Sequence, residues 1–153
     1  MLSKRAIHAL KALLQLAAEP QLWQSTHQLA AAQHLPEPML EQLLLRLRRA
    51  GVLVARRGRL GGYRLARGAR EIALAAVLEA LAEPAAVGGS PAASDRCGGD
   101  EAPSPADQVT AALQRRLERA RQKALAELSL EDLLFDLRSA EASSDAETGL
   151  LLG

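Results

Sequence analysis

The chain has 153 residues, of which 48% are hydrophobic, which is enough for the core of one small domain with an attached arm. Its overall charge of +1 hides two opposite halves: residues 1–70 carry 12 basic and 3 acidic side chains, a balance of +9, whereas residues 71–153 carry 7 and 15, a balance of −8. One cysteine excludes an intramolecular disulfide, and one Trp, one Tyr and one Phe leave Leu and Ala to fill the core, which excludes most strand-rich folds. We expect a mainly α, cytoplasmic protein without a membrane span, whose basic half faces a polyanion such as nucleic acid.

Two helices are predicted before residue 34. From Ser3 to Ala18 apolar residues recur at helical spacing, and Glu19-Pro20 ends the run. Ser25, followed three residues later by Gln28, has the pattern of a capping box and predicts a second helix over residues 26–33. A tight turn follows at residues 34–36.

A third helix is predicted to begin at Glu37, with Glu37 as its cap and Pro38 in its first turn, and to end at Gly51. Its leucines fall on one stripe, so this face should be buried. The stripe comprises Leu40, Leu43, Leu44 and Leu47.

Two short strands, residues 52–55 and 63–65, should flank a glycine-rich turn. Between Arg56 and Arg64, four of nine residues are arginine and three are glycine, so the backbone can turn tightly while guanidinium groups meet phosphate oxygens. Helix, helix, turn, helix and hairpin is the order of a winged helix-turn-helix. The alternative for this segment is a solvated basic hairpin without a partner.

After a helix predicted over residues 72–81, the segment 84–106 is rich in Pro, Gly, Ala and Ser and is expected to be a flexible effector or cluster-type loop. Residues 107–138 should then form a long dimerisation helix and a short terminal helix that Ser129 and Asp132 cap, with a disordered tail at 139–153. Residues 1–83 would be the DNA-binding domain.

The long helix carries an apolar stripe that a domain of this size cannot easily cover, so we expect it to pair with its copy in a homodimer. The alternative is a helix folded back on its own domain. The stripe comprises Val109, Leu113, Leu117, Ala120, Ala124 and Leu128.

The strings MLEQLLLRLRRAGVL, RRGRLGGYRLAR and EIALAAVLEAL resemble the Rrf2 family of bacterial transcription regulators, closely over residues 2–83 and loosely over 109–133. The resemblance implies a dimeric winged-helix repressor or activator that binds double-stranded DNA. It also implies that Glu41 and Gln42 face base edges and that Arg57 leads the wing. Family members usually carry Ser and Tyr where this chain has Pro38 and Met39, which changes the expected base contacts.

Further DNA contacts follow from charge and position. The third helix should enter the major groove, and other arginines should bind phosphates or the minor groove. As alternatives, the Glu41 carboxylate could interact only with the dipole of its own helix, and the residues at the start of the second helix could act only as its cap. The predicted DNA-binding residues are Thr26, His27, Gln28, Pro38, Met39, Glu41, Gln42, Arg46, Arg49, Arg56, Arg57, Arg59, Gly61 and Gly62, with Arg48 beside them. Tyr63 is expected to pack rather than touch a base.

Cofactor binding depends on Cys97. Cluster-binding members of the family supply three cysteines, because soft thiolates hold a two-iron, two-sulfur centre, whereas this chain has one. We expect no cofactor and no metal; the alternatives are a cluster held by Cys97 with help from His8 or nearby carboxylates (Asp95, Asp100 or Glu101), and a redox-sensing thiol.

No catalytic signature accompanies these motifs: there is no zinc spacing of paired cysteines, no nucleophile elbow and no phosphate-cradling loop followed by Lys. We therefore predict that the chain is not an enzyme. The remaining alternative to a DNA-binding repressor is a winged-helix module that binds protein.

Overall fold

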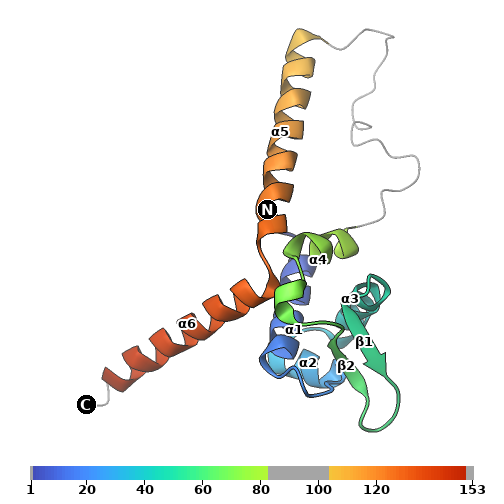
Figure 1. Ribbon diagram of the computed structural model, residues 1–153, viewed down its shortest axis with the longest axis vertical. Coiled ribbons are helices and arrows are strands. Elements are labelled where there is room, and N and C mark those ends of the chain that lie inside the picture. Colours follow the sequence, from blue (N-terminus) through green and yellow to red (C-terminus); the bar gives the residue numbers. More distant parts are fainter. Residues whose placement is uncertain (1, 83–103, 151–153) are drawn as a thin grey trace.

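The computed structural model describes the backbone of residues 2–82 and 104–150 and the side chains of residues 2–82 and 104–144 (Figure 1). A compact body holds the first four helices and a two-stranded hairpin. One long helix rises from this body and a second leaves it in another direction. The mainly helical class and the winged-helix order of elements are as the sequence predicts.

The first two helices of the body each begin at a side-chain cap. Helix α1 (Lys4–Ala18) begins where Ser3 Oγ accepts a hydrogen bond from the Ala6 N–H at 3.1 Å. Helix α2 (Thr26–Gln33) begins with the predicted capping box: the Gln28 N–H donates to Ser25 Oγ at 3.2 Å, and the Ser25 N–H donates to Gln28 Oε1 at 2.8 Å. It ends at His34, whose φ of 53° lies in the left-handed region.

Helix α3 (Glu37–Arg49) departs from the prediction at its first residue. Pro36 occupies the N-cap position, without a side-chain hydrogen bond, and Glu37 is the first helical residue. The assignment of Glu37 as the cap was wrong, because Pro36 already has the extended conformation that a cap requires. The Glu37 carboxylate instead lies 3.2 Å from Nδ1 of His27, so it links the starts of the two helices.

The hairpin consists of β1 (Leu53–Arg56) and β2 (Gly62–Leu65), paired antiparallel with Leu53 opposite Leu65 and Arg56 opposite Gly62. Gln24 adds a one-residue bridge on the other side of β2, where its N–H donates to the carbonyl of Tyr63 at 3.1 Å and its carbonyl accepts from the Tyr63 N–H at 2.8 Å. The segment before α2 is therefore tied to the hairpin.

A short 3-10 turn, η1 (Ala69–Glu71), and α4 (Leu74–Leu81) close the back of the body. Helix α5 (Pro105–Glu127) starts at a capping box of Ser104 and Asp107. At its far end Ala73 and Ser129 form an isolated bridge: the Leu74 N–H donates to the carbonyl of Leu128, and the Leu130 N–H to the carbonyl of Ile72, each at 2.9 Å.

Helix α6 (Leu130–Leu150) is much longer than predicted. The sequence placed its end at Arg138 and a disordered tail at 139–153, and this was wrong for residues 139–150, which are helical. Between Ser139 and Gly149 there is no helix breaker, and the hydroxyl groups of Ser143 and Ser144 donate to carbonyls four residues earlier.

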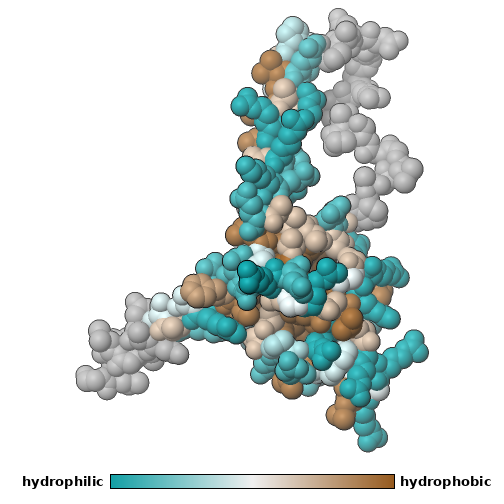
Figure 2. Space-filling view, in the orientation of Figure 1, coloured by the Kyte–Doolittle hydropathy of each residue, from teal (hydrophilic) through white to brown (hydrophobic). Residues whose placement is uncertain are grey.

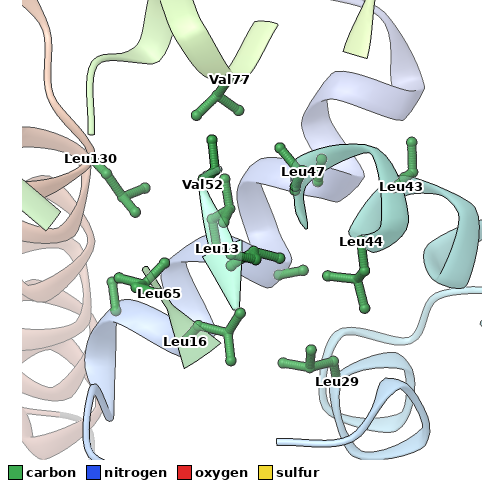
Figure 3. Packing of buried hydrophobic residues seen from close by; sticks show 14 of the residues in the cluster. Leu13, Leu16, Leu29, Leu43, Leu44, Leu47, Val52, Leu65, Val77 and Leu130 are labelled. Atoms are coloured by element: carbon green, nitrogen blue, oxygen red, sulfur yellow. The ribbon is translucent and has the colours of Figure 1, made fainter. Parts of the chain in front are cut away.

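The core is aliphatic, as predicted. Figure 3 shows leucine and valine side chains from α1, α2, α3, the hairpin, α4 and α6 converging on one cluster. Leu130 is fully buried and Leu134 nearly so, which places the first turns of α6 in the core of the winged-helix body rather than in a separate arm. The largest fully buried side chains are Leu13, Leu16, Leu29, Leu40, Leu44, Leu47, Leu53, Val77 and Leu130.

Candidate nucleic-acid interface

The outer face of α3 carries polar side chains. Its leucines at positions 40, 43, 44 and 47 are buried, which holds this helix against α1 and α2. Helical spacing turns the intervening positions outward, and the exposed residues are Glu37, Pro38, Glu41, Gln42, Leu45, Arg48 and Arg49. This exposed face therefore combines carboxylate, amide and guanidinium groups.

Two of the predicted contact residues on α3 have a different environment. Met39 is half-buried and packs against the core, and Arg46 is half-buried with Nη1 3.4 Å from the carbonyl of Leu81 at the end of α4. Both line a hollow of about 320 Å³ together with Arg5, Pro38 and Gln42. Arg46 is thus already engaged within the protein, whereas the side chains of Arg48 and Arg49 have no partner within residues 2–82 and 104–144.

The start of α2 lies beside the start of α3. Thr26 is half-buried and His27 and Gln28 are exposed, while Gln28 uses its side-chain oxygen in the capping box. The contact between His27 and Glu37 joins two exposed side chains. The three residues predicted to face a phosphate are thus grouped at one helix N-terminus.

The hairpin turn presents the remaining predicted arginines. Arg56, Arg57 and Arg59 are all exposed, and Leu60 at the tip is 82% exposed. The Gly61 N–H donates to the Gly58 carbonyl at 3.0 Å and closes the turn. Figure 2 shows hydrophilic side chains at the end of the hairpin, where they stand clear of the body.

Neither of the two glycines after the turn leaves room for a side chain. A Cβ on Gly61 would collide with the carbonyl oxygen of Arg56 across the hairpin. A Cβ on Gly62 would collide with the carbonyl of Gln24, and Gly62 also has a φ of 146°. These residues therefore shape the hairpin and bring it against the start of α2.

Three residues of this surface were missed by sequence reasoning. Leu45 is 36% exposed in the middle of the outer face of α3, between Glu41 and Arg48. The ring of Trp23 lies under the guanidinium groups of Arg64 and Arg56, with Cζ to ring-centroid distances of 4.7 and 5.9 Å. Strand alternation could have placed Arg64 beside Arg56, but nothing in the sequence indicated the one-residue pairing that brings Trp23 to them.

The predicted dimerisation stripe is uncovered. No residue of α5 is buried, and Val109, Leu113 and Leu117 are 69%, 55% and 62% exposed. Ala120, Ala124 and Leu128 are exposed as well. Figure 2 shows apolar patches along this helix among hydrophilic ones.

The candidate cluster ligands are only partly described. Cys97, Asp95, Asp100 and Glu101 lie outside the described residues, and within 2–82 and 104–144 no three His, Cys, Asp or Glu side chains gather as a metal site would require. His8 is half-buried on α1, and its Nδ1 is buried without a hydrogen-bond partner among the described residues. One thiol per chain does not fit a cluster held by several thiolates of the same chain.

Residues 2–136 match the family model of Rrf2, described as an iron-dependent transcriptional regulator. The chain belongs to the Rrf2 family. A Synechocystis sp. protein named as the HTH-type transcriptional regulator slr0846 is 38% identical over 143 residues, which cover 93% of this chain and 92% of that protein. The HTH-type transcriptional regulator IscR of Cereibacter sphaeroides is 40% identical over 85 residues, 54% of this chain and 55% of that protein.

Solved structures of Rrf2-type regulators share the fold. T. potens IscR aligns with a TM-score of 0.70 and 27% identity, covering 92% of this chain and 90% of that one. CymR, the global cysteine regulator of B. subtilis, aligns with a TM-score of 0.65 and 27% identity, covering 88% and 95%. The relatives are transcriptional regulators, so this Rrf2 protein is a transcriptional regulator and not an enzyme. Among residues 2–82 and 104–150, no helix has the length and apolar character to cross a bilayer.

Proposed function

We propose that this Rrf2 protein is a homodimeric, sequence-specific DNA-binding regulator, and that it represses transcription by occupying its operator. The observation that carries the proposal is the exposed polar face of α3 beside an arginine-rich hairpin. A helix fits the major groove of B-DNA, and a flanking hairpin can follow the adjacent backbone. Such a regulator would act in the cytoplasm.

Base recognition would fall to the outer face of α3. The Glu41 carboxylate can accept a hydrogen bond from cytosine N4, and the Gln42 amide can pair with adenine. Both side chains are exposed, so neither must leave a core position to reach a base edge. Pro38 at the start of the same face offers only apolar contact, for example to a thymine methyl group.

Phosphate contacts would come from three places around α3. Arg57 and Arg59 in the hairpin turn carry exposed guanidinium groups, and Arg48 and Arg49 lie in the last turn of α3. At the start of α2 the backbone N–H groups of Thr26 and His27 can face a phosphate, while that of Gln28 already donates to Ser25 Oγ. These groups fix the position of the protein on the duplex, whereas the base-facing side chains select the sequence.

Homodimerisation would cover the apolar stripe of α5. Leaving Val109, Leu113 and Leu117 in water is unfavourable, and a two-fold pair of α5 helices buries the same surface on both copies. The two α3 helices would then bind half-sites about one helical turn apart.

An iron-sulfur cluster is the second candidate property, because the family description names iron and IscR is among the relatives. The single thiol favours a regulator without a cluster, or one in which Cys97 responds to oxidation. Protein purified without oxygen should therefore show no visible absorption band. A band that disappears in Cys97→Ser would contradict this expectation.

The proposal is tested by titrating a random-sequence duplex of about 30 base pairs, long enough for two half-sites, at several salt concentrations. DNA binding predicts that log affinity falls linearly with log salt concentration, with a slope of about −0.9 per neutralised phosphate. A protein-binding module predicts no association with the duplex even at low salt. Absence of binding at the lowest salt concentration would reject the proposal.

A further inference from the structure

Trp23 occupies the root of the hairpin, where two guanidinium groups meet it. The Cζ atoms of Arg64 and Arg56 lie 4.7 and 5.9 Å from the ring centroid, within the range of cation-π interaction. It is the only tryptophan of the chain and is half-buried. No part of the function proposed so far uses it.

The backbone explains why these three side chains converge. Gln24 pairs with Tyr63 as a one-residue third strand, and Gln24 is 8% exposed, so its side chain lies on the core side of the sheet. Side chains alternate along a strand, which puts Trp23 on the outer side. Arg64 pairs with Val54, and two residues further along the ladder Arg56 pairs with Gly62. Side chains two residues apart on a strand share a face, so both arginines lie on this outer side.

Gly62 leaves room for this arrangement. It stands opposite Arg56 and next to the backbone of Gln24, which a Cβ at this position would strike. With no side chain at position 62, the segment before α2 can approach β2, and Arg56 can extend over the ring from the neighbouring strand. Both arginines therefore depend on the same close backbone approach.

The guanidinium groups of Arg56 and Arg64 can still bind an anionic ligand. Among the described residues, no carboxylate pairs with Arg56 or Arg64. A guanidinium that stacks on a ring through its face still presents N–H groups at its edge, which suit a phosphate. Holding a long, flexible side chain in place before binding lowers the entropy lost when it meets its ligand.

We propose that Trp23 is a positioning residue for DNA: it holds Arg56 and Arg64 at the hairpin root so that they bind duplex phosphates next to those bound by Arg57 and Arg59. The inference rests on the proposed DNA-binding function and extends the interface from the hairpin turn to its root. Trp23 acts through the two arginines and does not itself contact a base.

The test compares Trp23→Leu and Trp23→Phe with the wild type on the same random-sequence duplex of about 30 base pairs. Losing the preorganisation of two side chains should weaken binding about threefold to tenfold in the Leu variant, with the Phe variant in between. The decisive measurement is a double-mutant cycle, because Trp23→Leu should cause no further loss in a protein that already carries Arg56→Ala and Arg64→Ala. Arg67→Ala combined with Arg70→Ala, two exposed arginines outside the cluster, is the control for loss of two positive charges.

Fluorescence gives a second measurement that needs no change at Trp23. As the only tryptophan, Trp23 reports on the hairpin root alone, so adding the duplex should change its emission in the wild type but not in the Arg56→Ala, Arg64→Ala protein. If the wild type binds no duplex, the proposed function fails. If the wild type binds but Trp23→Leu binds equally well, or loses the same affinity with and without the two arginines, the positioning role is wrong.

Discussion

At the scale of single residues, glycine and arginine have different roles in the hairpin. The arginines supply charge, and Gly61 and Gly62 supply the space that lets the strands and the segment before α2 approach each other. The sequence predicted the charge and the turn, because both follow from composition. It could not predict the collision partner of Gly62, since Gln24 lies 38 positions away and pairs through one residue only.

Gly62→Ala should destabilise the fold more than Gly58→Ala. Both glycines have positive φ, 146° and 108°, so alanine is strained at either site by about 1–3 kcal/mol. Only at Gly62 would the new Cβ meet backbone, while nothing lies within 4 Å of a Cβ at Gly58. Chemical denaturation of both variants measures the difference, and an equal loss would show that the backbone contact with Gln24 does not constrain the hairpin.

At the scale of elements, local capping patterns predicted the starts of α2 and α6 but missed the start of α5. The capping boxes of Ser25 with Gln28 and of Ser129 with Asp132 were predicted and are present. The box of Ser104 with Asp107 was missed, because the apolar stripe of that helix begins only at Val109.

The length of α6 and its burial illustrate the limit of sequence patterns. The residues after Ser139 are rich in alanine and serine and have no apolar stripe, so the sequence suggested a disordered tail. The same residues are compatible with a helix, and the structure has one there. The burial of Leu130 depends on the bridge between Ala73 and Ser129, which joins residues far apart in sequence.

The cap of α6 should make stability depend on pH in acid. Ser129 donates to Asp132 Oδ2 from its hydroxyl at 2.7 Å and from its N–H at 2.8 Å, and these bonds lower the pKa of the Asp132 carboxyl. A carboxyl with a lowered pKa in the folded state stabilises the fold fully above its ordinary pKa and loses that effect as the pH falls through the folded value.

The difference in Tm between wild type and Asp132→Asn should therefore stay constant from about pH 6 to about pH 4 and shrink as the pH falls further towards about 2. Glu131→Gln, in the same helical turn, is the control for removing a carboxylate that does not cap the helix. A difference in Tm that stays constant over this pH range would refute the charged cap.

At the scale of the whole molecule, a basic body carries the proposed DNA surface and two helices lead away from it (Figure 1). The separation of charge between residues 1–70 and 71–153 anticipated this division. The sequence did not anticipate that α6 joins the core of the body, where it packs against α1, while the end of α5 lies against α4. A movement of α5 would therefore reach the winged-helix body through the junction at Ser129.

Leu113→Asp combined with Leu117→Asp should convert a dimer into a monomer, because two charges would enter the apolar contact between α5 helices. Gln114→Asp combined with Gln122→Asp adds the same charge away from the stripe and should leave the dimer intact. Sedimentation velocity at micromolar concentration distinguishes the species. A wild type that is already monomeric, or a leucine variant that stays dimeric, would rule out this interface.

The most direct test of the central claim, that the protein binds a duplex through α3 and the hairpin, is the salt dependence of binding for Arg57→Ala combined with Arg59→Ala. Losing two phosphate contacts per protomer should weaken binding to every duplex at least about tenfold and make the log-log salt slope shallower by about 1.8 per protomer. Glu41→Ala should keep the slope and change only the base preference in a random-sequence selection, and Arg115→Ala with Arg119→Ala, on the other side of α5, should change neither. An unchanged affinity and slope in the hairpin variant would contradict the account.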